Sequence, residues 1–181
     1  MATIEDRIAE STLHLLRTGG PRAVNVEAVA DHSGIAKTTI YRRHPDRRDM
    51  LATALSRVVI PPPPEFGTSA ADRLRWIIEH AIDPVDHGIG LGGRAALLLT
   101  DDDPAFTELF RRILADQRAP LIAAVEAGRA DGSMRADLDA ETLIDAIVGS
   151  YLAEYSRTGA RAEDWRQRLF TLFWPTVRAA G

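Results

Sequence analysis

The sequence has no cysteine, a single lysine and no long run of apolar residues. The absence of cysteine excludes both a disulfide framework and a thiolate metal site. The longest uncharged apolar run, residues 95–99, is far shorter than the roughly 20 residues that a transmembrane helix needs. We therefore expect no membrane partner. Because the first residues turn polar and acidic at once, we also expect no cleavable leader and a cytoplasmic location.

Alternation of apolar and polar residues with a period of two, which half-buried strands require, is missing as well. Apolar residues instead recur along the chain at the spacing of amphipathic helices. A chain of 181 residues is long enough to bury a core in one or two compact units. The pattern predicts an all-α fold.

A run of four prolines, Pro61 to Pro64, interrupts the helical pattern. No helix continues through such a run, which forms a stiff polyproline spacer about 12 Å long. We place the domain junction here, with one domain over residues 1–60 and a second helical domain over residues 61–181.

Charge is distributed unevenly over these two domains. The net charge of −4 divides into +2 for residues 1–60 and −6 for residues 61–181. Five basic residues and one acidic residue lie between Lys37 and Arg48. On an acidic protein, such a local patch directs contacts with phosphate groups to one end of the chain. A solvated helix face is the simpler alternative.

The N-terminal domain carries signals for short helices joined by tight turns. Thr3 and Asp6 have capping-box spacing, and Asn25 is a good N-cap for a second helix. Ser33-Gly34 then breaks the chain. Residues 25–43 thus have the spacing of a helix-turn-helix, whose second helix enters the major groove of DNA. The predicted helices span residues 4–18, 26–32, 36–43 and 46–59.

Within this helix-turn-helix, the pattern separates a packing face from an outward face. Ile35 and Ile40 are placed to hold the second helix against the first. Hydroxyls, an amine, a phenol and a guanidinium then face outward, and these groups suit contact with base edges and phosphates. The predicted outward set is Lys37, Thr38, Thr39, Tyr41 and Arg42.

Residues 4–52 resemble the N-terminal domain of TetR-family transcriptional repressors. Gly34 matches the turn glycine of that family, and Tyr41 matches a nearly universal tyrosine late in its recognition helix. Arg47 matches a basic residue that opens the fourth helix of the family. The resemblance implies an N-terminal three-helix DNA-binding domain and a C-terminal helical ligand-binding and dimerisation domain.

Two positions depart from the family pattern. Ala36 stands where a capping serine is frequent, and the lost cap costs about 1 kcal/mol. His44 stands where phenylalanine is usual, so it is either an aromatic replacement in the small core or a phosphate contact that strengthens on protonation. By the resemblance, Tyr41 and Arg47 contact phosphates, Lys37, Thr38 and Arg42 read bases, and Thr39 does either.

The resemblance also implies a function. It is that of a homodimeric repressor that binds palindromic operator DNA and is released by a small apolar or amphipathic molecule. A regulator of the same fold that activates, without a small-molecule ligand, is an alternative.

The second domain contains two helices with wide apolar coverage, over residues 139–157 and 163–179. The first has a large apolar face and a separate face of small residues, which lets another helix approach closely. We expect these two helices to form a four-helix dimer interface, with the core of a monomer as the alternative. The predicted interface residues are Ala146, Gly149, Ser150, Ala153, Trp165, Leu169 and Phe173.

A ligand pocket follows from the resemblance alone. Trp76 and His80 lie one turn apart, beside the main apolar stripe of a helix predicted over residues 70–82. Plain core packing is the alternative for each candidate. The predicted lining residues are Trp76, His80, Phe106, Phe110 and Tyr151.

An enzyme that uses residues 83–103 is the alternative from another functional class. Residues 88–93 match the dinucleotide fingerprint G-x-G-x-x-G by letter, but no strand signal precedes them, so a flexible loop is expected. Asp83, Asp86 and His87 form a weak candidate metal site. The acidic run 101–103 is a weak metal candidate as well, because a helix cap explains Asp103. We expect no catalytic residue, no metal and no cofactor.

Overall fold

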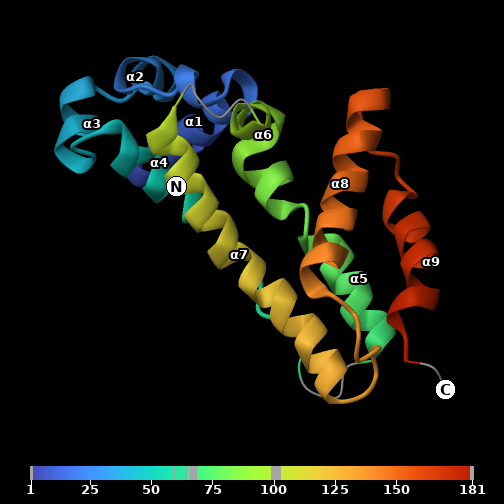
Figure 1. The fold of residues 1–181 in the computed structure, drawn as a ribbon. Helices are drawn as coiled ribbons and strands as arrows, with labels where there is room; N and C mark the ends of the chain where they lie inside the picture. The colour runs from blue at the N-terminus through green and yellow to red at the C-terminus, as the bar shows by residue number, and fades with distance from the viewer. Residues whose placement is uncertain (1, 59, 64, 66–68, 99–102, 180–181) are drawn as a thin grey trace. The chain divides into compact units, whose positions relative to one another are not determined.

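The computed structural model describes residues 2–58, 60–63, 65, 69–98 and 103–179 (Figure 1). All regular elements in these ranges are helical, apart from an isolated antiparallel bridge between Met134 and Arg178. The predicted all-α fold is confirmed. The elements are α1 (Ile4–Gly19), η1 (Pro21–Ala23), α2 (Val26–Ser33), α3 (Lys37–Arg43), α4 (Arg47–Leu55), α5 (Ala70–His80), η2 (Pro84–Ile89), α6 (Gly90–Leu98), α7 (Pro104–Ala130), α8 (Ala140–Thr158) and α9 (Trp165–Val177).

Side-chain caps fix the beginnings of several helices. In each case an oxygen of the cap residue accepts a hydrogen bond from the backbone N–H three residues further on, which contributes about 1 kcal/mol per helix. Helix α3 lacks such a cap because Ala36 precedes it, as predicted. The capping oxygens belong to Thr3 (3.1 Å), Asn25 (2.9 Å), Asp46 (2.8 Å), Asp103 (3.0 Å) and Asp139 (2.7 Å).

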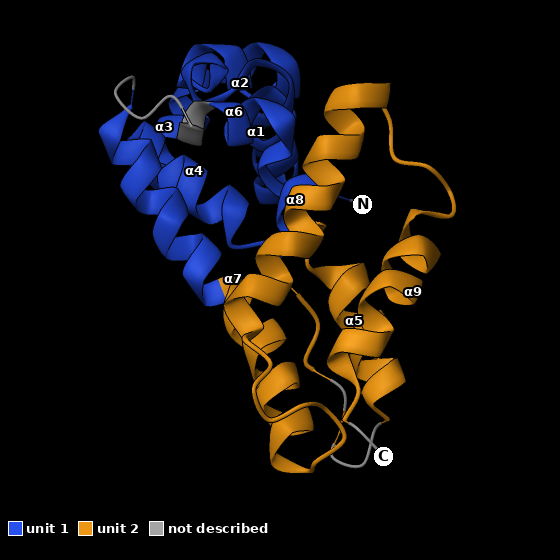
Figure 2. Cartoon of the chain, turned by 45° about the vertical axis from the view of Figure 1, so that its right-hand side comes forward, with its two compact units in different colours: residues 1–59, 84–116 blue, residues 60–83, 117–181 orange. Residues whose placement is uncertain are grey.

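The chain packs as two compact units, which Figure 2 distinguishes by colour. Unit 1 comprises residues 1–59 and 84–116, and unit 2 comprises residues 60–83 and 117–181. Helix α7 contributes residues to both. The division into sequence domains 1–60 and 61–181 stays a prediction, and the contacts assign residues 84–116 to the same unit as the N-terminal helices.

Helix α1 is central to unit 1. Helices α2, α4 and α6 all pack against it, as does η1. Each large aliphatic side chain that becomes fully buried here contributes about 1.5–3 kcal/mol. The core of unit 1 includes Ile8, Leu13, Leu16, Val29, Ile40, Met50, Leu51, Leu55, Ile89, Phe106 and Phe110.

The glycine-rich run 88–93 is helical, so the flexible loop expected there is wrong. The chain kinks at Gly88 and then enters α6 through Gly90, whose φ is +61°. A Cβ atom on Gly92 would lie 2.9 Å from the carbonyl oxygen of Arg17, so the backbones of α1 and α6 are almost in contact. These glycines permit close helix packing, and the preceding residues 69–87 form no strand that a dinucleotide site would require.

A side chain at the end of α1 also contacts the turn that precedes α6. Arg17 donates from Nε to the carbonyl oxygen of Gly88 at 3.1 Å and from another guanidinium nitrogen to that of His87. Arg17 therefore joins the end of α1 to the turn that leads into α6.

Unit 2 packs α5 against α8 and α9. Trp165 is buried, and its ring meets the edge of Tyr151 with 5.9 Å between the ring centroids. Arg73 on α5 is fully buried and pairs with Asp131, which follows α7, at 2.9 Å. Removing the aspartate would leave a buried charge without this partner, so the pair fixes where the turn after α7 lies.

Several helix ends differ from those predicted. Helix α4 ends at Leu55 instead of near residue 59, α5 ends at His80 instead of at residue 82, and α9 begins at Trp165 instead of at residue 163. The aspartates at 101 and 102 lie outside the described residues, whereas Asp103 caps α7 as expected. In the described part of the chain, no helix combines the length and apolar character that crossing a bilayer requires.

We predict that Gly92→Ala destabilises the protein by about 1–3 kcal/mol, because the added methyl group meets backbone atoms that have no room to move away. Those atoms are the Arg17 carbonyl oxygen at 2.9 Å and the Gly20 nitrogen at 3.0 Å. Urea unfolding followed by circular dichroism measures the difference. An unchanged midpoint would contradict the close approach of α1 and α6.

Candidate nucleic-acid interface

The turn between α2 and α3 is fixed by two local features and by one contact from α1. Gly34 ends α2 in the left-handed region with φ +68°, where a side chain would be strained. The Ser33 hydroxyl accepts a hydrogen bond from the backbone N–H of Ile35 at 3.2 Å. Arg7 on α1 donates to the carbonyl oxygen of Ser33. The angle at which α3 leaves α2 is therefore set by sequence-local groups and by α1.

Helix α3 presents a sharply divided surface. Ile40 is fully buried, whereas 56% of Tyr41 is exposed to solvent. The face that the sequence predicted to be outward is largely so: Lys37, Thr38, Tyr41 and Arg42 are exposed, and Thr39 is half-buried.

The amine of Lys37 is paired with the carboxylate of Glu27 on α2. Their hydrogen bond raises the pKa of Lys37 and lowers that of Glu27. Both side chains remain well exposed, so solvent screens the pair and other anions can compete for the lysine. The amine of Lys37 is thus accessible to a phosphate or a base edge, but it must first break its ion pair with Glu27.

Arg47, predicted to contact phosphates, is engaged inside unit 1. Its Nε donates to the carbonyl oxygen of Val24 at 2.7 Å, and another nitrogen donates to that of Pro21. A third nitrogen lies 2.7 Å from a carboxylate oxygen of Asp103. In this structure Arg47 therefore connects the start of α4 to the segment before α2 and to the cap of α7.

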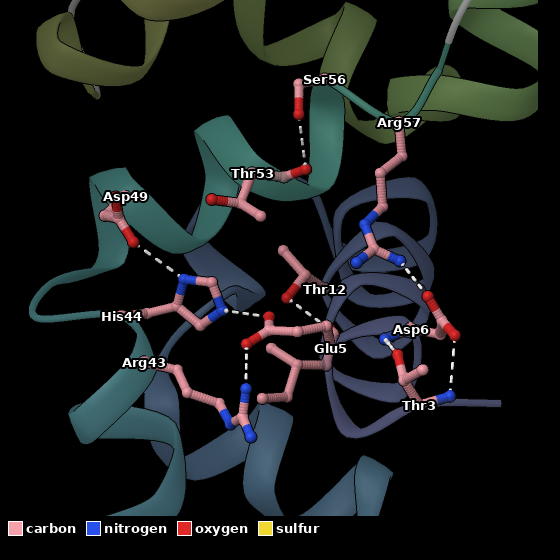
Figure 3. A network of polar contacts seen from close by, with 11 residues as sticks. Thr3, Glu5, Asp6, Thr12, Arg43, His44, Asp49, Thr53, Ser56 and Arg57 are labelled. Carbon is pink, nitrogen blue, oxygen red and sulfur yellow. Dashed lines mark hydrogen bonds and ion pairs between the residues drawn. The ribbon is translucent and has the colours of Figure 1, made fainter.

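His44 is buried, with 3% of its surface exposed, which leaves no room for the phosphate contact considered from the sequence. Its Nδ1 lies 2.8 Å from an Asp49 carboxylate oxygen, and its Nε2 lies 3.3 Å from one of Glu5 (Figure 3). Arg43 approaches the other oxygen of Glu5 at 2.5 Å. The core role considered for His44 is the one that the structure supports, although the ring faces charges as well as apolar groups.

A second polar link joins α1 to the turn after α4. Asp6 accepts the backbone N–H of Thr3 at 2.7 Å and a nitrogen of Arg57 at 2.5 Å (Figure 3). Chiefly through the bonds with Thr3, and further through Arg57, the pKa of Asp6 falls to about 2. The carboxylate stays ionised over the whole physiological range and keeps both ends of this link in place.

The residues predicted for a dimer interface fall into two groups. Ala146, Gly149 and Ala153 are exposed on one face of α8, and Ser150 and Phe173 are half-buried. Trp165 and Leu169 are buried within the chain itself, at 2% and 5% exposure, so their main role is in the core of unit 2.

The five residues predicted to line a ligand pocket are not brought together within either unit. Phe106 and Phe110 belong to the core of unit 1. In unit 2, the ring of Trp76 lies 5.1 Å from that of His80, whose Nδ1 is 2.7 Å from Asp83. Tyr151, also in unit 2, packs against Trp165. Their role in ligand binding stays a prediction.

Sequence reasoning missed four residues that shape these surfaces. Glu27, Glu5 and Asp49 are the acidic partners of Lys37, Arg43 and His44, and no local pattern relates residues that lie up to 38 positions apart. Leu172 was also missed, although the wide apolar coverage of the last helix contained that signal; it is 65% exposed.

A first helix packed through one face, a tight turn and a second helix that exposes a phenol and basic groups form a helix-turn-helix, the motif of many DNA-binding domains. Residues 8–54 match the family model of bacterial regulatory proteins, tetR family. These residues are therefore similar to the N-terminal domain of that family, as the sequence indicated. No curated protein matches the sequence significantly.

Solved structures extend the likeness to nearly the whole chain. A TetR-family regulator from Rhodococcus sp. has a TM-score of 0.75 at 21% identity, over 97% of this chain and 98% of that one. A TetR regulator from Agrobacterium tumefaciens gives 0.65 at 21% identity, over 97% and 94%. A regulator from Saccharomonospora viridis, solved with choline, gives 0.67 at 20% identity, over 97% and 98%. The fold is that of TetR-family transcriptional regulators.

We predict that Arg47→Ala lowers the free energy of unfolding by about 1–3 kcal/mol, since it removes donors to two carbonyls and a carboxylate. The matched control is Arg48→Ala, an exposed neighbour on the same helix, which should change stability by less than about 0.5 kcal/mol. Urea unfolding distinguishes them. Equal stability of the two variants would show that Arg47 is available for another role.

Proposed function

We propose that this protein is a homodimeric transcriptional repressor that binds palindromic operator DNA through α3 and is released by a small molecule. The observation that carries the proposal is the division of α3, with Ile40 fully buried and 56% of Tyr41 exposed beside basic side chains. This is how a recognition helix is presented to the major groove.

The side chains of α3 supply both kinds of DNA contact. Tyr41 carries a hydroxyl that can donate to a phosphate oxygen, which positions the helix on the duplex. Lys37, Thr38 and Arg42 are exposed and supply the donors and acceptors that base edges recognise, with Thr39 at the border. His44 and Arg47 leave this set, because the structure holds both inside unit 1.

Dimerisation is supported by an uncovered face on α8 and α9. A Cβ atom on Gly149 would meet no atom within 4 Å, and Ala146 and Ala153 are exposed beside it. A groove of about 430 Å³ follows this face and is lined in part by Ser150, Leu169 and the exposed Leu172. Small residues beside an exposed leucine suit a second copy of the same helices, which would hold two recognition helices about 34 Å apart.

A small apolar or amphipathic ligand is the expected signal. The regulator from Saccharomonospora viridis was solved with choline, so a protein of this fold takes a small molecule. Trp76, His80 and Tyr151 remain our candidates in unit 2, whereas Phe106 and Phe110 already fill the core of unit 1.

The glycine run that suggested a competing enzyme function has a structural role. The glycine run serves the contact between α6 and α1. Within the described residues, no group of three or more potential metal ligands comes together.

We predict that the purified protein binds DNA from upstream of its own gene more tightly than random DNA, with affinity that falls steeply as salt rises. Tyr41→Ala should weaken this binding more than tenfold. Tyr41→Phe, which keeps the ring and loses the hydroxyl, should weaken it about tenfold or more because one hydrogen bond to a charged group is lost. Fluorescence anisotropy across a salt series measures both. Full affinity in Tyr41→Ala would refute the assignment of α3.

We predict that Ala153→Arg converts the dimer into a monomer without unfolding it, because the new charge lies on the uncovered face of α8 and would be buried at an interface. Ala123→Arg, also exposed but on α7, is the control and should leave the dimer intact. Sedimentation velocity at micromolar concentration gives the mass. A dimer of unchanged mass in Ala153→Arg would place the interface elsewhere.

A further inference from the structure

A carboxylate of α2 lies beside the first residue of α3. Glu27 is the second residue of α2, and it pairs with the amine of Lys37, which opens α3. The side chains of Glu27 and Lys37 are 72% and 49% exposed. Asp31, one turn further along α2, is exposed as well and attracts the same amine. The start of the recognition helix therefore presents an acid and a base side by side, and both are open to an approaching molecule.

The backbone of Glu27 has little freedom to move away from α3. Val26 and Val29, which lie on either side of it in α2, are buried in the core of unit 1. Gly34 ends α2 in the left-handed region, and this turn sets the angle at which α3 leaves. A groove that receives the start of α3 therefore receives the carboxylate of Glu27 too, and only the side-chain rotamer of Glu27 can change.

Duplex DNA offers a carboxylate few partners. Phosphate oxygens and most polar atoms on the base edges are acceptors, and only the exocyclic amines of cytosine and adenine donate hydrogen bonds in the major groove. An ammonium group has the opposite preference, and the adjacent O6 and N7 acceptors of guanine suit a lysine. A G·C base pair combines these two acceptors with an amine, so it can take both partners when Lys37 and Glu27 separate.

We propose that Glu27 is a specificity-determining residue, and that it and Lys37 together read one G·C base pair in each half-site of the operator. Lys37 donates to the guanine, and the carboxylate of Glu27 accepts from the cytosine amine. Where no amine lies at this place, the carboxylate faces acceptors and phosphates, so affinity falls. The inference rests on the proposed function, and it adds a residue of α2 to the recognition surface of α3.

The experiment measures how affinity depends on each base pair of a duplex that the full-length protein has selected from a random pool. Fluorescence anisotropy at constant ionic strength gives the affinities. Replacing one particular G·C pair should weaken binding by the wild type about fivefold or more. Glu27→Ala and Lys37→Met should each lose the preference at this same base pair. Glu27→Ala should also bind random DNA about twofold more tightly, because one negative charge no longer faces the phosphates.

The opposite signs of the two effects of Glu27→Ala distinguish recognition from a loss of structure. A variant that only disturbs α3 binds selected and random DNA more weakly. Glu10→Ala is the matched control, because Glu10 is an exposed acid that also pairs with a basic residue, Arg17 at 3.4 Å, but lies on α1. It should keep the wild-type preference at every base pair. Circular dichroism establishes that each variant is folded.

The outcomes separate this inference from the proposed function. Unchanged base preferences in Glu27→Ala overturn the role of Glu27 and leave the proposed function standing. Preferences lost at different base pairs in Glu27→Ala and Lys37→Met overturn it as well, and so does an equal loss in Glu10→Ala. Absence of selective binding by the wild type overturns the proposed function, and the role of Glu27 with it.

Discussion

The burial of α1 on several of its faces is the constraint on which unit 1 depends. Helices α2, α4 and α6 all pack against it, and even its small polar residues Ser11 and Thr12 are buried. The Thr12 hydroxyl donates a hydrogen bond to the carbonyl of Ile8 within the same helix at 2.8 Å, so no other helix has to provide an acceptor. A helix enclosed in this way cannot be repacked on one face alone. The helix-turn-helix and α6 consequently share one rigid support.

Features that depend on neighbouring residues were predictable from the sequence. The caps at Asn25, Asp46 and Asp139 follow from local hydrogen bonding, and the division of α3 follows from a period of 3.6 residues. The helical glycine run was not predictable, because the gain from close packing against α1 outweighs the poor helix propensity of glycine and depends on a contact about 70 residues away.

The candidate interface was predictable only in part, for a related reason. Its exposed members on α3 were recognised from local pattern and resemblance. The engagement of Arg47 by Pro21, Val24 and Asp103 comes from segments that meet only in the folded chain. Charge pairs of this kind leave no periodic trace in a single sequence. The basic residues Lys37 and Arg43 each meet an acid, so an anion that approaches either of them must displace an existing partner.

The pair between Lys37 and Glu27 has a practical consequence. Lys37 is the only lysine of the chain, so apart from the N-terminal amine it is the sole target for reagents that react with primary amines. A fluorophore or cross-linker attached in this way is placed on α3 without any engineered cysteine. Because acylation requires the uncharged amine, and Glu27 favours the charged one, the rate of labelling reports directly whether this pair is formed or broken.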